Sequence, residues 1–183
     1  MNLYRKFLGI DDGFFPKDYK KEKGLTVLVG LLYENGKPIR FDLERVTVDG
    51  NDCTKAINRI AQKLDPDLIL SDSVTCAGFN FISPEDINFP LIIVYNYKPN
   101  INSIMNALMK HMKDDRVDII IKVISNLKEI ISKKGKIYAY FSKVSEYDGI
   151  NYINYNQEYS KIPEPIRGAG VLASAISRWL ISY

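Results

Sequence analysis

Three aspartates stand at points of the chain where a catalytic carboxylate could be held. Asp11, Asp49 and Asp72 each closely follow a short apolar run of the kind that forms a buried strand. Open sheets bind ligands in the crevice beyond the carboxyl ends of their strands, so these side chains can share one site. Asp11 is the hardest to explain structurally, because a carboxylate next to a buried strand is partly desolvated, which is costly without a cation or hydrogen bonds.

The chemistry that such a cluster suits is hydrolysis assisted by a hard cation. Ligands that offer only oxygen favour Mg²⁺ or Mn²⁺ over zinc, and three converging anions repel one another until a metal is bound. A metal held in this way can activate water and stabilise the charge on a phosphodiester. Each aspartate also has a purely structural explanation, since Asp49 precedes Gly50 in a turn and Asp72 closes a strand.

Other chemistries find little support in the sequence. The single histidine, His111, lies between lysines on a polar helical face, so we expect a surface residue and no triad or histidine-bound zinc. Neither common phosphate-binding glycine motif occurs. Cys53 and Cys76 have no zinc-site spacing, and we expect two ordinary small buried thiols in a reducing compartment.

The elements that would position the aspartates can be predicted from hydrophobic periodicity. Asn35-Gly36 is a strong hairpin signal between two strand-like runs. The expected strands are Phe7–Ile10, Leu25–Tyr33, Ile39–Val48, Leu68–Leu70, Pro90–Tyr95 and Lys136–Phe141. The expected helices are Cys53–Leu64, 101–112, 117–131 and one that begins near Pro163 or Pro165 and turns Ile166, Ala169, Leu172, Ala173, Ile176 and Leu180 inward. Tyr147–Tyr159 has no clear pattern.

This order begins with a hairpin and continues with helical crossovers. A short connection suits antiparallel strands and a helical one suits parallel neighbours, so we expect an α/β fold: a mixed β-sheet with helices on both faces. That is the plan of ribonuclease H-like domains, although other mixed α/β folds also fit. No linker or repeat divides the chain, and we expect one domain over residues 1–183.

Composition limits the classes of partner. The net charge of +3 permits a polyanionic partner without requiring one. No apolar run approaches the ~20 residues that cross a bilayer, and the N-terminus has no signal-peptide pattern, so we expect a cytoplasmic protein without a membrane partner.

Several short motifs, in this order, resemble a known family. They are Gly9-Ile10-Asp11-Asp12-Gly13, Val48-Asp49-Gly50 leading into a helix, Leu68-Ile69-Leu70-Ser71-Asp72, Ala77-Gly78-Phe79-Asn80 and Pro163-Glu164-Pro165-Ile166-Arg167. Together they resemble the archaeal deoxyuridine endonuclease family, which is related to endonuclease V within the ribonuclease H-like superfamily. The similarity extends over most of the chain.

The resemblance implies roles for particular residues. Asp11 matches the first-strand aspartate of endonuclease V, Asp72 matches the aspartate that closes its fourth strand, and Asp49 stands nearest to its acidic residue ahead of the first helix. These three are the expected catalytic and metal-binding residues. Glu164 and Arg167 match a C-terminal turn of that family, where we expect them to support the final helix rather than contact the substrate.

The chain also departs from endonuclease V. Ser73 follows Asp72 where that family has glycine and then histidine, no counterpart of its aromatic-proline wedge occurs between Pro38 and Val48, and Gly170 stands where a polar residue is usual. These differences leave metal binding by the aspartates in place and leave the choice of base open.

Aromatic residues among lysines are the candidate nucleic-acid contacts. Rings stack on unpaired bases and lysines neutralise phosphates, which favours Phe14, Phe15, Lys17, Tyr19, Lys20 and Lys98. Alternatively, Phe14 and Phe15 anchor their loop to the core.

The resulting prediction is a Mg²⁺- or Mn²⁺-dependent endonuclease acting on nucleic acid, with DNA favoured, near a deaminated base such as uracil or hypoxanthine. One alternative is a non-catalytic nucleic-acid-binding module of the same fold, and another is a domain that binds small molecules or proteins. The sequence does not indicate an oligomeric state.

Overall fold

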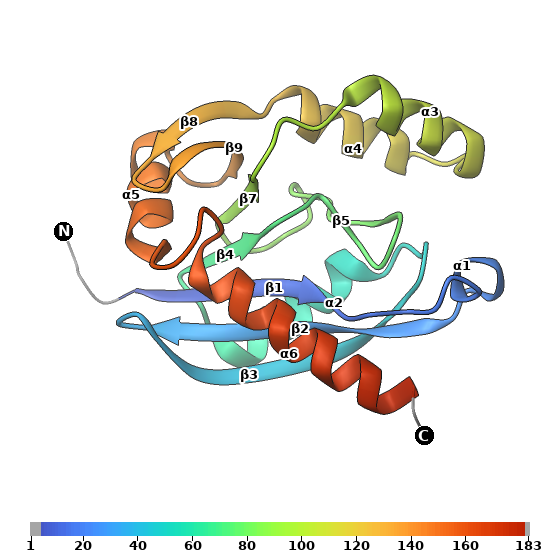
Figure 1. Cartoon of the computed structure of the whole chain (residues 1–183), viewed down its shortest axis with the longest axis horizontal. Helices are drawn as coiled ribbons and strands as arrows, with labels where there is room; N and C mark the ends of the chain where they lie inside the picture. Colours follow the sequence, from blue (N-terminus) through green and yellow to red (C-terminus); the bar gives the residue numbers. More distant parts are fainter. Residues whose placement is uncertain (1–4, 182–183) are drawn as a thin grey trace.

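A seven-stranded mixed sheet with helices on both faces forms the part of the chain described by the computed structural model, residues 5–181 without the side chain of residue 21 (Figure 1). Across the sheet the strands are β3 (Lys37–Thr47), β2 (Leu25–Glu34), β1 (Lys6–Asp12), β4 (Leu68–Ser71), β7 (Leu91–Tyr95), β9 (Gly135–Ser142) and β8 (Lys128–Ser132). A small ladder pairs β5 (Thr75–Cys76) with β6 (Asn80–Phe81). The helices are α1 (Tyr19–Glu22), α2 (Cys53–Leu64), α3 (Ile101–His111), α4 (Arg116–Ser125), α5 (Glu146–Asn156) and α6 (Glu164–Ile181).

The sheet has a parallel centre between two antiparallel edges. β3, β2 and β1 form an antiparallel meander, whereas β1, β4 and β7 run parallel to one another. β9 and β8 then return antiparallel at the far edge. The predicted α/β fold with a mixed sheet is therefore confirmed. β4 is the central strand, and its carboxyl end lies beside that of its parallel neighbour β1.

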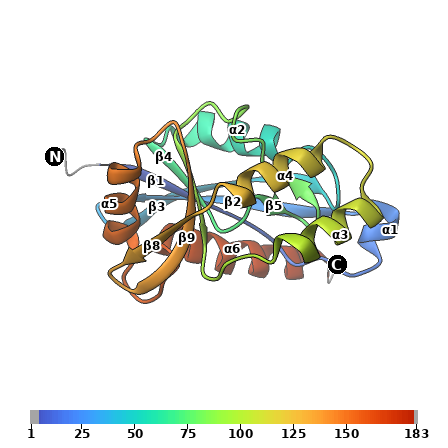
Figure 2. The same cartoon turned by 90° about the horizontal axis from the view of Figure 1, so that it is seen from above.

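Side chains of β1 alternate between two apolar layers. Leu8 and Ile10 pack with α2, α3 and α4 on one face, and Phe7 packs with α5 and the start of α6 on the other. Figure 2 shows α2 and α6 on opposite sides of the sheet. The period of two along a strand therefore decides which helix each residue of β1 faces.

Local signals predicted the hairpin and the first long helix closely. Asn35 and Gly36 both have positive φ, 53° and 73°, as a two-residue type I′ turn requires. Helix α2 has the predicted bounds, Cys53–Leu64. Asp52 precedes it but does not cap it with its side chain, because its carboxylate accepts hydrogen bonds from Thr47 and Asn80 instead.

The predicted helix over residues 117–131 is wrong at its C-terminal end. Helix α4 stops at Ser125, and Lys128–Ser132 forms the edge strand β8. The residues concerned, Ile130 and Ile131, show the alternation of a strand, since Ile130 is buried and Ile131 is 73% exposed. Leu180 is also mostly on the surface, 40% exposed, rather than turned inward. The stretch without a clear pattern contains helix α5.

The expectation of two free thiols is also wrong. Cys53, at the first position of α2, and Cys76, in β5, are joined by a disulfide. Both residues are buried, as predicted, but a sequence gives no direct sign that residues 23 positions apart come together. The bond links the N-terminus of α2 to the turn that follows β5.

We predict that removing this disulfide lowers the free energy of unfolding by about 3 kcal/mol, because the unfolded chain loses a closed loop of this length. Urea unfolding of a Cys53→Ala/Cys76→Ala variant measures the effect. The wild-type protein in dithiothreitol should match that variant, and wild-type stability that is unchanged by the reductant would contradict the prediction.

No helix within residues 5–181 combines the length and apolar character that crossing a membrane requires.

Candidate functional site

Asp11 and Asp72 lie side by side at the carboxyl edge of the parallel strands. β1 and β4 pair in register, with Gly9 opposite Leu70 and Ile10 opposite Ser71, so the next pair is Asp11 and Asp72. Both side chains fall on the face that α6 covers, because they continue the alternation of Gly9 on β1 and Leu70 on β4. The structure therefore brings together two of the three predicted acidic residues.

A third carboxylate, that of Asp12, completes the acidic end of β1. Burial raises the pKa of Asp12, a backbone hydrogen bond from Ala77 opposes that shift, and repulsion from Asp72 adds to it. The sequence analysis did not single out Asp12, whose side chain strand alternation turns to the opposite face from that of Asp11. The signal that could have identified it is the Asp11-Asp12 pair itself, two adjacent carboxylates at the end of a buried strand.

Burial makes all three carboxyls weaker acids than usual, and repulsion adds to this effect at Asp11 and Asp12. Burial, then Asp72, then Asp12 raise the pKa of Asp11 to about 7, although a 2.8 Å hydrogen bond from the Asp12 backbone N–H to Asp11 Oδ1 opposes the shift. Burial raises the pKa of Asp12 to about 6 and also raises that of Asp72. Groups that resist ionisation in this way are stabilised by a neighbouring cation.

The residues present are compatible with a divalent metal ion. Within residues 5–181 no three Asp, Glu, His or Cys residues form a complete metal-binding set. Mg²⁺, however, is commonly held by one or two carboxylates together with water and substrate phosphates. Asp11 and Asp72 supply such a pair.

We predict that the metal-free protein loses stability as pH rises from about 4 to about 7, and that Mg²⁺ restores it at pH 8. The pKa of Asp11 is 3.8 in a model peptide and about 7 in the folded protein. The stability that protonated Asp11 contributes is therefore fully present below pH 3.8 and is lost as the pH rises through about 7. The melting temperature with and without Mg²⁺, at pH 5 and pH 8, tests this.

The control for this prediction is Asp11→Asn, which has no charge to titrate. Its stability should depend less on pH, and Mg²⁺ should raise its melting temperature much less than that of the wild-type protein. An equal shift with Mg²⁺ in both proteins would mean that the ion binds elsewhere.

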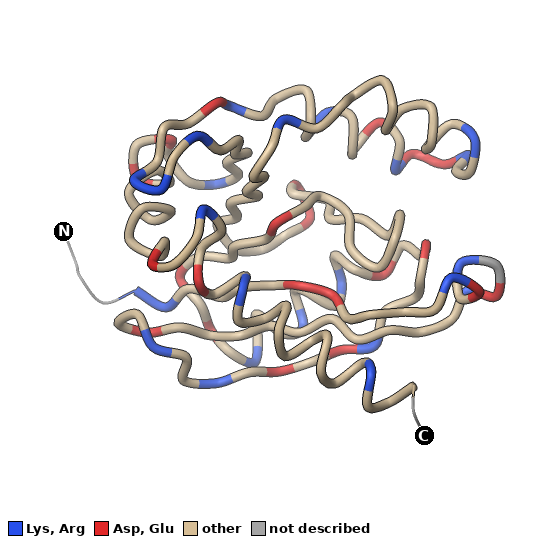
Figure 3. The backbone as a smooth tube through the Cα atoms, in the orientation of Figure 1, with Lys and Arg blue, Asp and Glu red and all other residues tan. Residues whose placement is uncertain are grey.

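Helix α6 forms the wall of the cleft that contains Asp11 and Asp72. The cleft measures about 640 Å³, and Arg167, Ser174 and Arg178 of α6 line it as well. Figure 3 shows basic positions along α6 near the acidic end of β1. The lining of this cleft therefore combines two carboxylates with two arginines, a set of residues that suits a metal ion and a phosphate together.

The lack of a side chain at Gly170 leaves space for the carboxylate of Asp11. A Cβ atom at this position would lie 2.2 Å from Asp11 Oδ2, closer than atoms can approach. Sequence comparison marked Gly170 only as a departure from endonuclease V, and the structure supplies a physical reason for a glycine there.

Glu164 and Arg167 tie the beginning of α6 to the segment before it. Arg167 donates from Nε to Glu164 Oε2 at 2.7 Å, and Glu164 Oε1 accepts from the backbone N–H of Tyr159. The Arg167 guanidinium also lies 5.8 Å from the centre of the Tyr159 ring. We propose a supporting role for both residues, with Arg167 also bordering the cleft.

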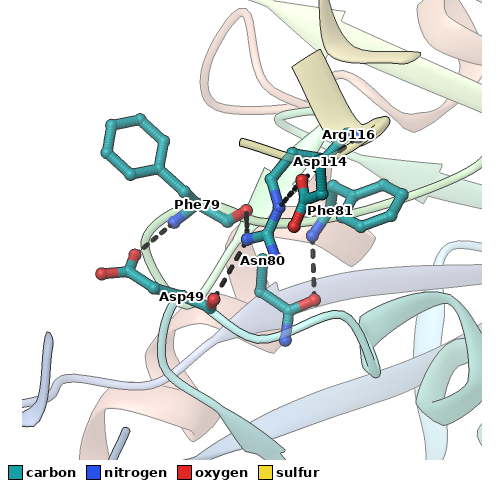
Figure 4. Close-up of polar contacts among 6 residues, drawn as sticks. All are labelled: Asp49, Phe79, Asn80, Phe81, Asp114 and Arg116. Atoms are coloured by element: carbon teal, nitrogen blue, oxygen red, sulfur yellow. Dashed lines mark hydrogen bonds and ion pairs between the residues drawn. The ribbon is translucent and has the colours of Figure 1, made fainter. Parts of the chain in front are cut away.

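Asp49 lies in a different cleft from Asp11 and Asp72. Its Oδ1 accepts a 2.7 Å hydrogen bond from the backbone N–H of Phe79, and its carbonyl accepts from Arg116 (Figure 4). Asp49 has a φ of 55°, so the chain turns sharply where the third strand ends. The structure therefore does not group Asp49 with the predicted metal ligands.

The predicted nucleic-acid contacts are dispersed. Phe14, 42% exposed, lies under the guanidinium of Arg178 at 4.5 Å, and its backbone N–H donates to Ser177 of α6. Phe15 is half-buried, Lys17 and Lys98 are exposed, Tyr19 packs over Gly24, and Lys20 borders the cleft of Asp49. Lys98 lies near Glu129 of β8, far along the sheet from the loop that holds the others.

Comparison with known proteins agrees with the motifs in the sequence. The model of the family "Endonuclease dU" matches residues 4–177. A protein of Sulfurisphaera tokodaii named "UPF0215 protein" is 37% identical over 177 residues, which is 95% of this chain and 96% of that protein.

Solved structures share the fold. A protein of unknown function from Archaeoglobus fulgidus superposes with a TM-score of 0.77 at 21% identity, covering 94% of this chain and 98% of that one. Endonuclease V of Ciona intestinalis, in complex with a DNA 24mer containing an inosine, superposes with a TM-score of 0.56 at 15% identity, covering 98% and 86%. The predicted ribonuclease H-like fold is thereby confirmed. Because the family model spans nearly the whole chain, this protein belongs to the endonuclease dU family.

Proposed function

We propose that this protein is a divalent-metal-dependent endonuclease that hydrolyses a phosphodiester bond in DNA near a deaminated base. The observation that carries the proposal is the pair of neighbouring carboxylates, Asp11 and Asp72, at the carboxyl edge of two parallel strands. They open into a cleft whose other wall carries Arg167 and Arg178. Family membership and the shared fold of an endonuclease V solved with inosine-containing DNA support the same class of reaction.

In this proposal the side chains of the chain bind and orient. Asp11 and Asp72 hold Mg²⁺ or Mn²⁺, and Asp12 adds negative charge beside them. When bound, the metal supplies an activated water and charge stabilisation at the phosphate. Arg178 positions the phosphate from α6, and Arg167, paired with Glu164, supports the start of that helix at the border of the cleft. Asp49, the third predicted ligand, is assigned a structural role because its carboxylate holds the Phe79 backbone in the neighbouring cleft.

A nicking assay tests the proposal. End-labelled DNA strands containing uracil, hypoxanthine or neither, in single- and double-stranded form, are incubated with Mg²⁺, Mn²⁺ or EDTA. We expect metal-dependent cleavage near the altered base and none in EDTA. RNA of the same sequence establishes the sugar preference.

The alternative, a non-catalytic nucleic-acid-binding module, is favoured by the absence of a third acidic ligand among the described residues. It predicts that no strand is cut under any condition, while binding is retained and is unaffected by Asp11→Asn. That outcome would refute the proposed hydrolysis.

A further inference from the structure

A second cleft, separate from the acidic one, lies where four distant segments of the chain meet. It measures about 600 Å³ and is bordered by residues of α1, the β5–β6 turn and the neighbouring ends of α3 and α4. The residues that matter here are Lys20, Lys23, Phe79, His111, Lys113 and Arg116. None of them belongs to the cleft of Asp11 and Asp72.

Aromatic rings line part of this cleft. The rings of Phe79 and His111 are nearly parallel, with an interplanar angle of 20° and centroids 6.4 Å apart. The Nζ of Lys20 lies 5.7 Å from the centre of the Phe79 ring. Figure 4 shows the Phe79 side chain projecting away from the hydrogen bonds of its own backbone. A flat ring with cations near it is the arrangement that stacks an unpaired base.

Both carboxylates at this cleft are engaged in bonds that fix its frame. Arg116 is buried and donates from Nη1 to the carbonyls of Asp49 and Phe79, at 3.0 Å each. Its Nε donates to Asp114 at 2.6 Å, and Asp49 accepts from the Phe79 N–H (Figure 4). The turn that carries Phe79 is therefore held rigidly.

The remaining charge of the cleft is positive. Within residues 5–181, none of the three lysines at this cleft, Lys20, Lys23 and Lys113, forms an ion pair with a carboxylate. Three such cations around an aromatic ring can neutralise phosphates on either side of a stacked base.

One turn of the chain contacts both Asp49, at the basic cleft, and Asp12, next to Asp11. The carbonyl of Ala77 accepts from the backbone N–H of Asp49 at 2.9 Å, while the same residue supplies a backbone hydrogen bond to the carboxylate of Asp12. Ala77 and Gly78 therefore separate the acidic site from the basic cleft. A strand crossing this turn can reach both.

We propose that the basic cleft binds an unpaired segment of the nucleic acid, with one base stacked on Phe79 and His111 and flanking phosphates on Lys20, Lys23 and Lys113. This rests on the proposed nuclease function and deepens it, because it makes single-stranded DNA, or a strand with locally unpaired bases, the substrate class. The same strand then continues over the Ala77 turn to Asp11 and Asp72.

Binding of a fluorescent thymidine oligonucleotide to the full chain in EDTA, where no cleavage occurs, tests the proposal. Phe79→Leu keeps apolar bulk but removes the ring. We expect affinity to fall about fivefold or more, which corresponds to the low end of the binding free energy that one base–aromatic stack contributes. The matched control is Tyr147→Leu, which removes an exposed ring from α5 and should leave affinity unchanged.

Salt dependence tests the lysines separately. Lys20→Gln/Lys113→Gln should lower the slope of log affinity against log salt by about 0.7 for each lysine on a single strand. Lys134→Gln, in the β8–β9 turn on the opposite side of the molecule from α1 (Figure 1), should leave the slope unchanged. Thermal melting establishes that each variant is folded.

An abasic site makes the readout specific to stacking. An abasic site at one particular position of the oligonucleotide should weaken binding to the wild-type protein. The same abasic site should not weaken binding to Phe79→Leu. The proposal is overturned if both Phe79→Leu and the double lysine variant bind the oligonucleotide with wild-type affinity. It is also overturned if blunt duplex binds as tightly as the single strand and neither variant weakens that binding. If no strand is ever nicked, the nuclease proposal fails while these binding results still decide the role of the basic cleft.

Discussion

Asp11→Asn is expected to lower the rate of metal-dependent strand cleavage about a thousandfold. Asparagine has nearly the same shape and keeps a side-chain oxygen. That oxygen can accept the hydrogen bond that the Asp12 N–H donates to Asp11 Oδ1, at 2.8 Å, in the wild-type protein. The substitution removes the negative charge that a hard cation requires. A bound metal supplies several kcal/mol of transition-state stabilisation, and about 4 kcal/mol corresponds to a factor of about a thousand. Single-turnover nicking in Mg²⁺ is the measurement.

Asp49→Asn is the matched control for this prediction. It removes the same charge from the other cleft, so most of the cleavage activity should remain. A loss as large as that of Asp11→Asn would place Asp49 in the metal site during catalysis, and wild-type activity of Asp11→Asn would remove the acidic pair from the mechanism. Above pH 7, metal-free Asp11→Asn should also melt at a higher temperature than the wild-type protein, since no charge is then desolvated at this position and repulsion from Asp72 and Asp12 is relieved.

The features that the sequence predicted well depend on short-range patterns. The turn at Asn35-Gly36 needs positive φ at two positions, and few residue pairs adopt that conformation readily. Helix α2 carries Ile57, Ile60 and Leu64 on one buried face, which only a helical period explains. Each of these two structures is determined by residues close together in the sequence, so contacts with distant parts of the chain do not alter them.

Strand β8, which was expected to be helical, shows why hydrophobic periodicity fails elsewhere in the chain. Ile120, Ile124, Leu127 and Ile131 follow one another at spacings of four, three and four residues, so a helical period can be extended from α4 into β8. The structure ends the helix at Ser125 because the following segment pairs with β9, and Ile130 lies opposite Ile137 in that ladder. Pairing between strands is a non-local contact, and periodicity alone does not contain it.

The acidic site was predicted in part for a similar reason. Asp11 and Asp72 end parallel strands, and that position alone places them together at the sheet edge. Asp49 ends an antiparallel strand two places away, where a left-handed residue turns its carboxylate toward Phe79. The basic cleft could not be predicted, because its residues come from four segments that meet only in the folded chain.

Gly9→Ala is expected to lower the free energy of unfolding by about 3 kcal/mol, the upper range for adding a methyl group to a packed interior. A Cβ atom at Gly9 would lie 2.0 Å from the backbone C and O of Pro165, at the start of α6. Neither backbone can yield like a flexible side chain, so α6 must lift from β1. Urea unfolding measures the loss.

Gly30→Ala is the control for Gly9→Ala. Gly30 lies opposite Ile10 in the neighbouring strand, and its new methyl group would meet a side-chain atom, Ile60 Cγ2 at 2.4 Å, rather than backbone. We expect a loss of about 1 kcal/mol there. Equal losses for the two variants would show that α6 does not need close contact with β1. If Gly9→Ala does lift α6, Gly170 moves away from Asp11 Oδ2 and Arg178 from the cleft. Nicking by the folded fraction should then fall as well, whereas Gly30→Ala should leave it intact.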